Sequence, residues 1–122
     1  MKKAASINLA KIKAKELPSS TVKADFGDGN GEQDFTVHAI GDIARRDIMD
    51  VLNDQREINR NSKLQLILLT EGLDCIDGDK AAARYLLENA TEACLLVTAE
   101  IVRITNEFYA KKGEEKEAAE KN

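Results

Sequence analysis

The stretch that most constrains the fold is EACLLVTAEIVRITNEFY, residues 92–109, the longest strongly apolar periodic run in the chain. Its apolar side chains recur at spacings of three and four, which is the period of one face of an α-helix. They form two parallel rows: Cys94, Val97, Ile101, Ile104 and Phe108, and beside them Leu95, Val102 and Tyr109. So wide a stripe must be covered, either by the core of a small domain or by another subunit.

The opposite face of this predicted helix is polar. It carries Glu92, Thr98, Glu100, Arg103, Asn106 and Glu107. The spacings of three and four between Glu100, Arg103 and Glu107 allow opposite charges to pair on a solvated surface. Nothing on the helix suggests catalysis, so function has to be inferred from assembly and from resemblance.

Length and composition indicate one domain with a helical, aliphatic core. A chain of 122 residues is long enough for one hydrophobic core and too short for two of normal size. Only 4% of its residues are aromatic, so the core should be mainly aliphatic. Cys75 and Cys94 lie in apolar surroundings without a CxxC motif, so we expect reduced core thiols. There is no apolar run of about 18 residues and no signal-peptide pattern. We therefore expect a cytoplasmic protein without a membrane span.

Charge is distributed unevenly along the chain. The first 24 residues contain six lysines and one acid, a balance of +5, which leaves −9 on the remainder because the whole chain carries −4. Residues 1–20 are predicted to be a basic arm, either solvated or docked on an acidic partner or neighbouring subunit. The arm has no arginine and no aromatic residue, so it lacks the donors and stacking planes that nucleic-acid readers use. Nucleic acid is not the expected partner.

Residues 21–40 predict a β-hairpin. Apolar and polar side chains alternate in two short runs, with Val22, Ala24 and Phe26 in the first and Phe35, Val37 and Ala39 in the second. This is the period of half-buried strands. The segment between them, GDGNG at 27–31, tolerates positive φ and suits the hairpin tip. Two strands alone are marginal in water, so a helix must cover their apolar face.

Residues 42–110 predict about four helices. Asp42 suits the first N-cap, and the polar residues 59–62 favour a break before the apolar segment LQLILL. That segment has the length of a strand, but its extension to Gly72, a suitable residue to follow a helix, favours a helix. Asp79 suits the N-cap of the next helix.

The hydrophobic pattern defines the boundary before the last helix and the two ends of the chain less clearly than it defines the helices themselves. The helix that begins after Asp79 either continues unbroken through residues 92–109 or meets them at a corner capped by Thr91, and we favour the corner. Residues 6–17 predict a short helix that ends before Pro18. Residues 111–122 have no long apolar side chain and alternate in charge, which predicts a flexible tail.

The predicted fold is therefore α+β and mainly α, with one N-terminal antiparallel β-hairpin packed on a bundle of about four helices. A single globular domain covers residues 21–110, with the hairpin at 21–40 and the helices at 42–110. The residues expected in its core are Leu68, Leu86, Val97, Ile101 and Ile104.

Short motifs do not identify a reaction centre. Asp28, Asn30 and Glu32 alternate as at the start of a calcium loop, but Gln33 and Ala39 stand where an EF-hand needs Gly and Glu. The single histidine, His38, lies on the polar face of a predicted strand with no second group to orient it. We expect no catalytic residue, no metal site and no cofactor.

The order of segments resembles that of the small tail assembly chaperones of long-tailed bacteriophages. The resemblance covers roughly residues 20–110. After a lysine-rich start, it is carried by the segments DFTVHAI, GDIARRDIMDVLND, LQLILLTEGL, LDCIDGDKAA and LLVTAEIVRITNEF. It implies a non-enzymatic late protein of the host cytoplasm that binds the tape measure protein, helps recruit tail-tube subunits and does not remain in the finished virion.

The aliphatic character of the predicted helices is compatible with such a role, since an exposed apolar face can hold a helical partner or a second copy of the chain. The candidate contact residues are the outer row of the last helix and the lysines of the arm, namely Leu95, Val102, Tyr109, Lys11, Lys13 and Lys15. Two other functions remain open, a head–tail connector or minor tail component and a small nucleic-acid-binding regulator.

Overall fold

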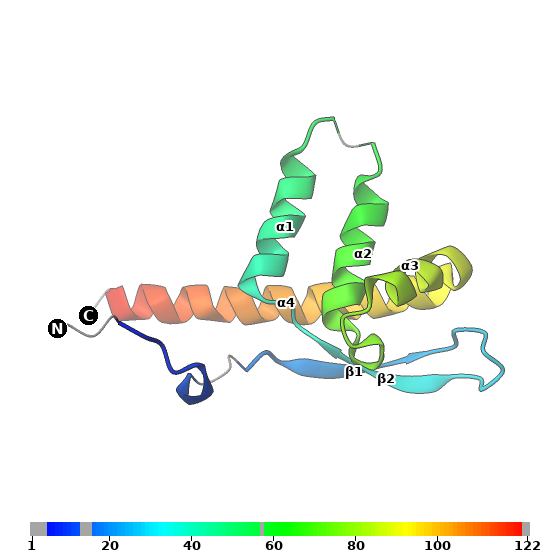
Figure 1. The fold of residues 1–122 in the computed structure, drawn as a ribbon, viewed down its shortest axis with the longest axis horizontal. Coiled ribbons are helices and arrows are strands. Elements are labelled where there is room, and N and C mark those ends of the chain that lie inside the picture. The colour runs from blue at the N-terminus through cyan, green and yellow to red at the C-terminus, as the bar shows by residue number, and fades with distance from the viewer. Residues whose placement is uncertain (1–4, 13–15, 57, 121–122) are drawn as a thin grey trace.

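A computed structural model describes residues 5–12, 16–56 and 58–120, and side chains as far as residue 116. The fold is α+β and mainly helical, which confirms the predicted class (Figure 1). The described residues form η1 (Leu9–Lys11), β1 (Ser19–Ala24), β2 (Gln33–His38), α1 (Asp42–Asn53), α2 (Arg60–Gly72), η2 (Asp74–Ile76), α3 (Lys80–Asn89) and α4 (Thr91–Glu120), where η marks a 3-10 turn.

Helix α4 is the element on which the others are arranged. In Figure 1 the strands run along one side of α4, whereas α1 and α2 stand away from its other side as a helical hairpin. Both strands, α2 and α3 pack against α4, and α1 rests mainly on α2. The long helix therefore lies between the sheet and most of the helical hairpin, and only the end of α2 contacts β2.

The β-hairpin forms where the alternating pattern predicts it. The register places Val22 opposite Phe35, and Val37 is fully buried against the helices. At the tip, Gly27, Gly29 and Gly31 have φ of 78°, 87° and 73°, which explains the glycines there. The ring of Phe26 meets that of Phe35 edge to face at 4.8 Å, so Phe26 packs on the sheet although it follows the end of β1.

The core lies where α4 meets the sheet and α2. Its largest fully buried side chains are Leu69, Leu73, Ile101, Val37, Val97 and Cys94. Leu68 and Ile104 are also buried, as predicted, whereas Leu86 is only half-buried because α3 lies at the edge of the core. Thr98, predicted on the polar face of α4, is buried too, and its hydroxyl donates a hydrogen bond to the Leu95 carbonyl at 3.2 Å.

Gly72 allows α2 to approach α4 closely. A Cβ at this position would lie 2.7 Å from Cδ1 and 2.9 Å from Cγ1 and Cγ2 of Ile101. The sequence predicted that Gly72 would follow the end of a helix, but it is the buried last residue of α2, with Leu73 as the C-cap. Its absent side chain, not a positive φ, is what the fold requires.

The helical hairpin breaks slightly earlier than predicted. Helix α1 ends at Asn53 and α2 begins at Arg60, so the polar cluster 59–62 forms the first turn of α2. The Arg60 guanidinium donates to the Asp54 carbonyl at 2.8 and 3.3 Å, which fastens the two ends of the connection. Asp42, the predicted N-cap, is the first residue of α1, and Gly41 is the N-cap; the Asp42 carboxylate lies 3.0 Å from the Tyr109 hydroxyl of α4.

The favoured corner between α3 and α4 is confirmed. Asp79 caps α3, accepting hydrogen bonds from the backbone N–H groups of Ala81 and Ala82 at 3.0 and 3.2 Å. Helix α3 ends at Asn89, and Thr91 begins α4. The Thr91 hydroxyl donates to the Leu87 carbonyl at 3.1 Å, so this side chain terminates α3 and does not cap α4 as predicted.

The two ends of the chain differ from the predictions. In place of a helix at 6–17, the described part of that segment contains only the single turn η1, and residues 13–15 lie outside the described residues. Three apolar side chains there have no core to join and remain exposed, namely Ile7, Leu9 and Ile12. At the other end α4 continues to Glu120, because the Ala, Lys and Glu of this segment are strong helix formers.

Candidate partner-binding grooves

An apolar groove runs between the helical hairpin and α4. It consists of two adjoining cavities of about 280 and 450 Å³ that share Leu64, Leu68 and Val102. Helix α1 contributes Ile48, Met49 and Leu52, and α4 contributes Leu95 and Thr98. We call this surface the aliphatic groove.

The aliphatic groove exists because α1 has more apolar surface than α2 can cover. Within α1 only Ala44 is buried, while Met49 and Leu52 are 53% and 46% exposed. Across the groove on α4, Leu95 and Val102 are 49% and 39% exposed. The structure therefore leaves apolar side chains of α1 and α4 facing water on either side of the less exposed Leu64 and Leu68 of α2.

Two of the three predicted outer-row residues lie in this groove, and the third does not line it. Tyr109 is half-buried, and its hydroxyl lies 3.1 Å from the Ile40 carbonyl oxygen and 3.0 Å from a carboxylate oxygen of Asp42. The Arg45 guanidinium lies 3.6 Å above the Tyr109 ring. Tyr109 thus joins α4 to the start of α1, which makes it a structural contact in this chain.

The predicted lysines are not brought to the groove. Lys11 is exposed in η1, while Lys13 and Lys15 lie outside the described residues. In Figure 1, η1 lies on the side of α4 that carries the sheet, away from the helical hairpin. A role of these lysines in partner binding stays a prediction.

None of the groove residues outside α4 was predicted from the sequence as a contact, and Met49 on α1 and Leu64 on α2 are two examples. Both belong to segments that were predicted to be apolar helices, so their type of environment was foreseeable. Their position in the groove follows from the way in which the helical hairpin stands away from α4 (Figure 1). No short-range pattern encodes that arrangement.

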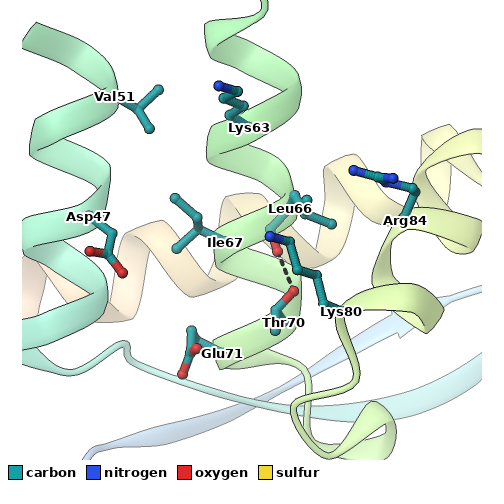
Figure 2. Close-up of a pocket in the computed structure, with 9 residues that line it drawn as sticks. All are labelled: Asp47, Val51, Lys63, Leu66, Ile67, Thr70, Glu71, Lys80 and Arg84. Carbon is teal, nitrogen blue, oxygen red and sulfur yellow. Dashed lines mark hydrogen bonds between the residues drawn. The ribbon is translucent and has the colours of Figure 1, made fainter. Parts of the chain in front are cut away.

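A second, charged groove lies on another face of α2, between α1 and α3 (Figure 2). Leu66 and Ile67 form its apolar floor, and the cavity measures about 400 Å³. Cationic side chains come from α2 and α3 and carboxylates from α1 and α2, namely Lys63, Lys80, Arg84, Asp47 and Glu71. The Thr70 hydroxyl donates to the Leu66 carbonyl at 2.6 Å, so this hydroxyl serves the helix.

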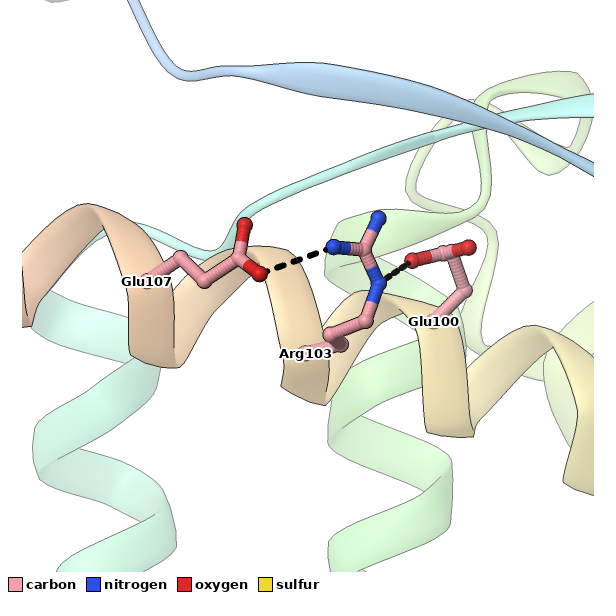
Figure 3. Close-up of polar contacts among 3 residues, drawn as sticks. All are labelled: Glu100, Arg103 and Glu107. Atoms are coloured by element: carbon pink, nitrogen blue, oxygen red, sulfur yellow. Dashed lines mark hydrogen bonds and ion pairs between the residues drawn. The ribbon is translucent and has the colours of Figure 1, made fainter.

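The predicted ion pairs on the polar face of α4 are present. Arg103 bonds to Glu100 and, at 2.9 Å, to Glu107 (Figure 3). The hydrogen bond that the Arg103 guanidinium donates to the Glu100 carboxylate is the main cause of the raised pKa of Arg103. Arg103 is exposed, so these pairs add little to stability and mainly keep this side of α4 hydrated.

His38 and the cysteines do not form a reactive cluster. His38 contacts the Asp74 carboxylate, so it has the partner that the sequence did not reveal, and this contact connects β2 to η2. Cys94 is fully buried, and burial raises the pKa of its thiol to about 11. Cys75, predicted in the core, is exposed in η2 because this short turn lies at the surface.

Among the described residues no group of His, Cys, Asp and Glu side chains is arranged to hold a metal ion. None of the described helices is long and apolar enough to cross a bilayer. Comparison with known proteins finds no matching family model, no matching curated protein and no matching solved structure.

Proposed function

We propose that the protein is a tail assembly chaperone of a long-tailed bacteriophage. In this role it holds an apolar stripe of the tape measure protein in the aliphatic groove, helps recruit tail-tube subunits and works without catalysis in the host cytoplasm. The observation that carries the proposal is the exposure of apolar side chains from α1 and α4 along one continuous groove whose floor is formed by Leu64 and Leu68 of α2.

The dimensions of the groove suit a helical ligand. Leu95 and Val102 are seven residues apart on α4, a separation of about 10 Å or two helical turns. A partner helix with apolar residues at positions i, i+3, i+4 and i+7 presents anchors over the same length. Met49 and Leu52 on α1 form the facing wall, so such a helix would be held from two sides.

The chemistry of the groove suits temporary holding of an aggregation-prone partner. Its wall contains Met49, a flexible side chain that adapts to irregular surfaces. Arg45 and Asn106 stand at its edge and can meet the polar rim of an amphipathic helix. The groove therefore selects for apolar stripes in general and not for one short peptide sequence.

Co-expression tests the proposal. The tape measure protein encoded by the same phage is expected to be insoluble alone and soluble with this chain, and Val102→Asp is expected to return it to the insoluble fraction. Val102 is 39% exposed, so the new carboxylate can remain hydrated and the chain should stay folded. The same carboxylate places a negative charge in the apolar groove, which should prevent an apolar partner from binding. Leu96→Asp is the matched control, because Leu96 lies on the same helix, is 55% exposed and does not line the groove.

Three outcomes would count against the proposal. If Val102→Asp solubilises the partner as well as the native chain does, the groove is not the binding surface. If the chain binds no tail protein, the assigned function is wrong. If the chain is retained in purified particles, a connector or minor tail component is the better assignment. Circular dichroism of both variants serves as the control that each remains folded.

A further inference from the structure

One edge of the sheet is open. The Ala39 N–H donates to the Pro18 carbonyl at 2.9 Å, and the register continues in step from this pair into the hairpin. In an antiparallel ladder such bonded pairs alternate with non-bonded pairs, so every second residue of β1 directs its N–H and C=O groups away from β2. These outward residues are Ser19, Thr21 and Lys23.

No described residue forms a backbone hydrogen bond with those outward groups of β1. The other edge of the sheet is different, because Val37 of β2 forms a bridge with Leu73 and β2 packs beside η2. Strand edges are usually protected by proline, charge or a bulge. Along the six residues of β1 only Lys23 offers such protection, and Thr21 and Val22 suit a strand.

We propose that the open edge of β1 pairs antiparallel with β1 of a second copy, centred on Thr21, and that the two hairpins form one four-stranded sheet. In this register Thr21 faces Thr21 of the second copy, and Ser19 faces Lys23 at both ends. All of these are outward-directed residues, so the pairing makes roughly six N–H···O bonds between the copies. A two-fold axis relates the copies, which closes the assembly at two.

The strand is complementary to itself in this register. Lys23 lies opposite Ser19 of the second copy, so no like charges face each other. Val22 lies opposite Ser20 of the second copy, on the half-buried face that packs towards α4. An unrelated strand would have to satisfy both conditions by chance, which is why a second copy is the occupant we propose.

The exposed area and the stability of the sheet also favour a partner. The chain exposes 9326 Å², whereas a compact monomer of 13.4 kDa exposes roughly 6,500 Å². The chain therefore exposes more surface than a compact monomer of its mass, and a dimer interface would cover part of it. Pairing would also extend the two-stranded sheet, which is covered by α4 on one face, to four strands.

Cross-linking tests the register directly. In a Cys75→Ser background, Thr21→Cys is expected to form a covalent dimer under mild oxidation, since bonded antiparallel pairs have Cα atoms about 5.5 Å apart, within disulfide range. Cys94 is fully buried and does not interfere. Thr36→Cys is the matched control, because Thr36 lies opposite Thr21 in the hairpin and is also exposed, but belongs to β2.

Sedimentation tests the assembly without a cross-link. The native chain is expected to sediment with twice the mass of 13.4 kDa, and Thr21→Pro, which removes an outward N–H, is expected to halve the mass while leaving the circular dichroism unchanged. A native chain that stays monomeric, or Thr36→Cys that cross-links as fast as Thr21→Cys, would overturn the proposal. Val102→Asp should remain dimeric, so failure of the groove and failure of the edge are distinguishable.

Discussion

At the scale of single residues, the fold depends on the missing side chain of Gly72. Ala in place of Gly inside a helix usually stabilises it by about 0.5–1 kcal/mol. Here the added methyl would overlap Ile101, which is 0% exposed and has no room to move. We expect Gly72→Ala to lower the free energy of unfolding by about 1–3 kcal/mol, measured by urea denaturation.

A double-mutant cycle checks this explanation. Ile101→Ala alone should cost about 2–5 kcal/mol, as large-to-small changes in packed cores do. In the double variant the space left by Ile101→Ala can hold the methyl group added by Gly72→Ala. The combined loss of unfolding free energy should therefore be smaller than the sum of the single losses. Additive losses would mean that Gly72 and Ile101 do not compete for the same space.

At the scale of elements, the cap of α3 provides the sharpest test. Asp79 is the predicted cap whose carboxylate meets two backbone N–H groups, so Asp79→Ala should destabilise the protein by about 1 kcal/mol. Asp79→Asn keeps an acceptor oxygen and should lose much less. A thermal melt compares the two variants, and equal losses would show that the cap is not what stabilises α3.

Elements were predictable where the local pattern was strong. The alternation around Val22 and Phe35, the acid at Asp79 and the apolar period of residues 92–109 each determine one element by short-range physics. The predictions were wrong where competing effects were close in energy. The segment at 6–17 lacks a surface to pack on, and residues 111–120 combine high charge with strong helix propensity.

At the scale of the whole molecule, the sequence could not give the arrangement of elements around α4. The candidate residues Leu95 and Val102 were correctly placed on one apolar row, but Tyr109 on the same row is held by Ile40 and Asp42. The contact between Tyr109 and Ile40 joins residues that are 69 positions apart in the sequence, and the spacing of apolar residues does not predict such a contact. The groove was therefore predictable as an apolar helix face, and its shape was not.

The central position of α4 has a consequence for the order of folding during synthesis. The Ile40 N–H donates to the Thr105 hydroxyl at 3.1 Å across 65 residues, so the β-hairpin is completed by a segment that the ribosome releases near the end. Until then the sheet and the helical hairpin share only the contacts of β2 with η2 and the end of α2, and such long-range closure is slow. A nascent chain that stops before Thr105 should stay unfolded and open to proteases, whereas one that reaches Tyr109 has every partner that its core requires.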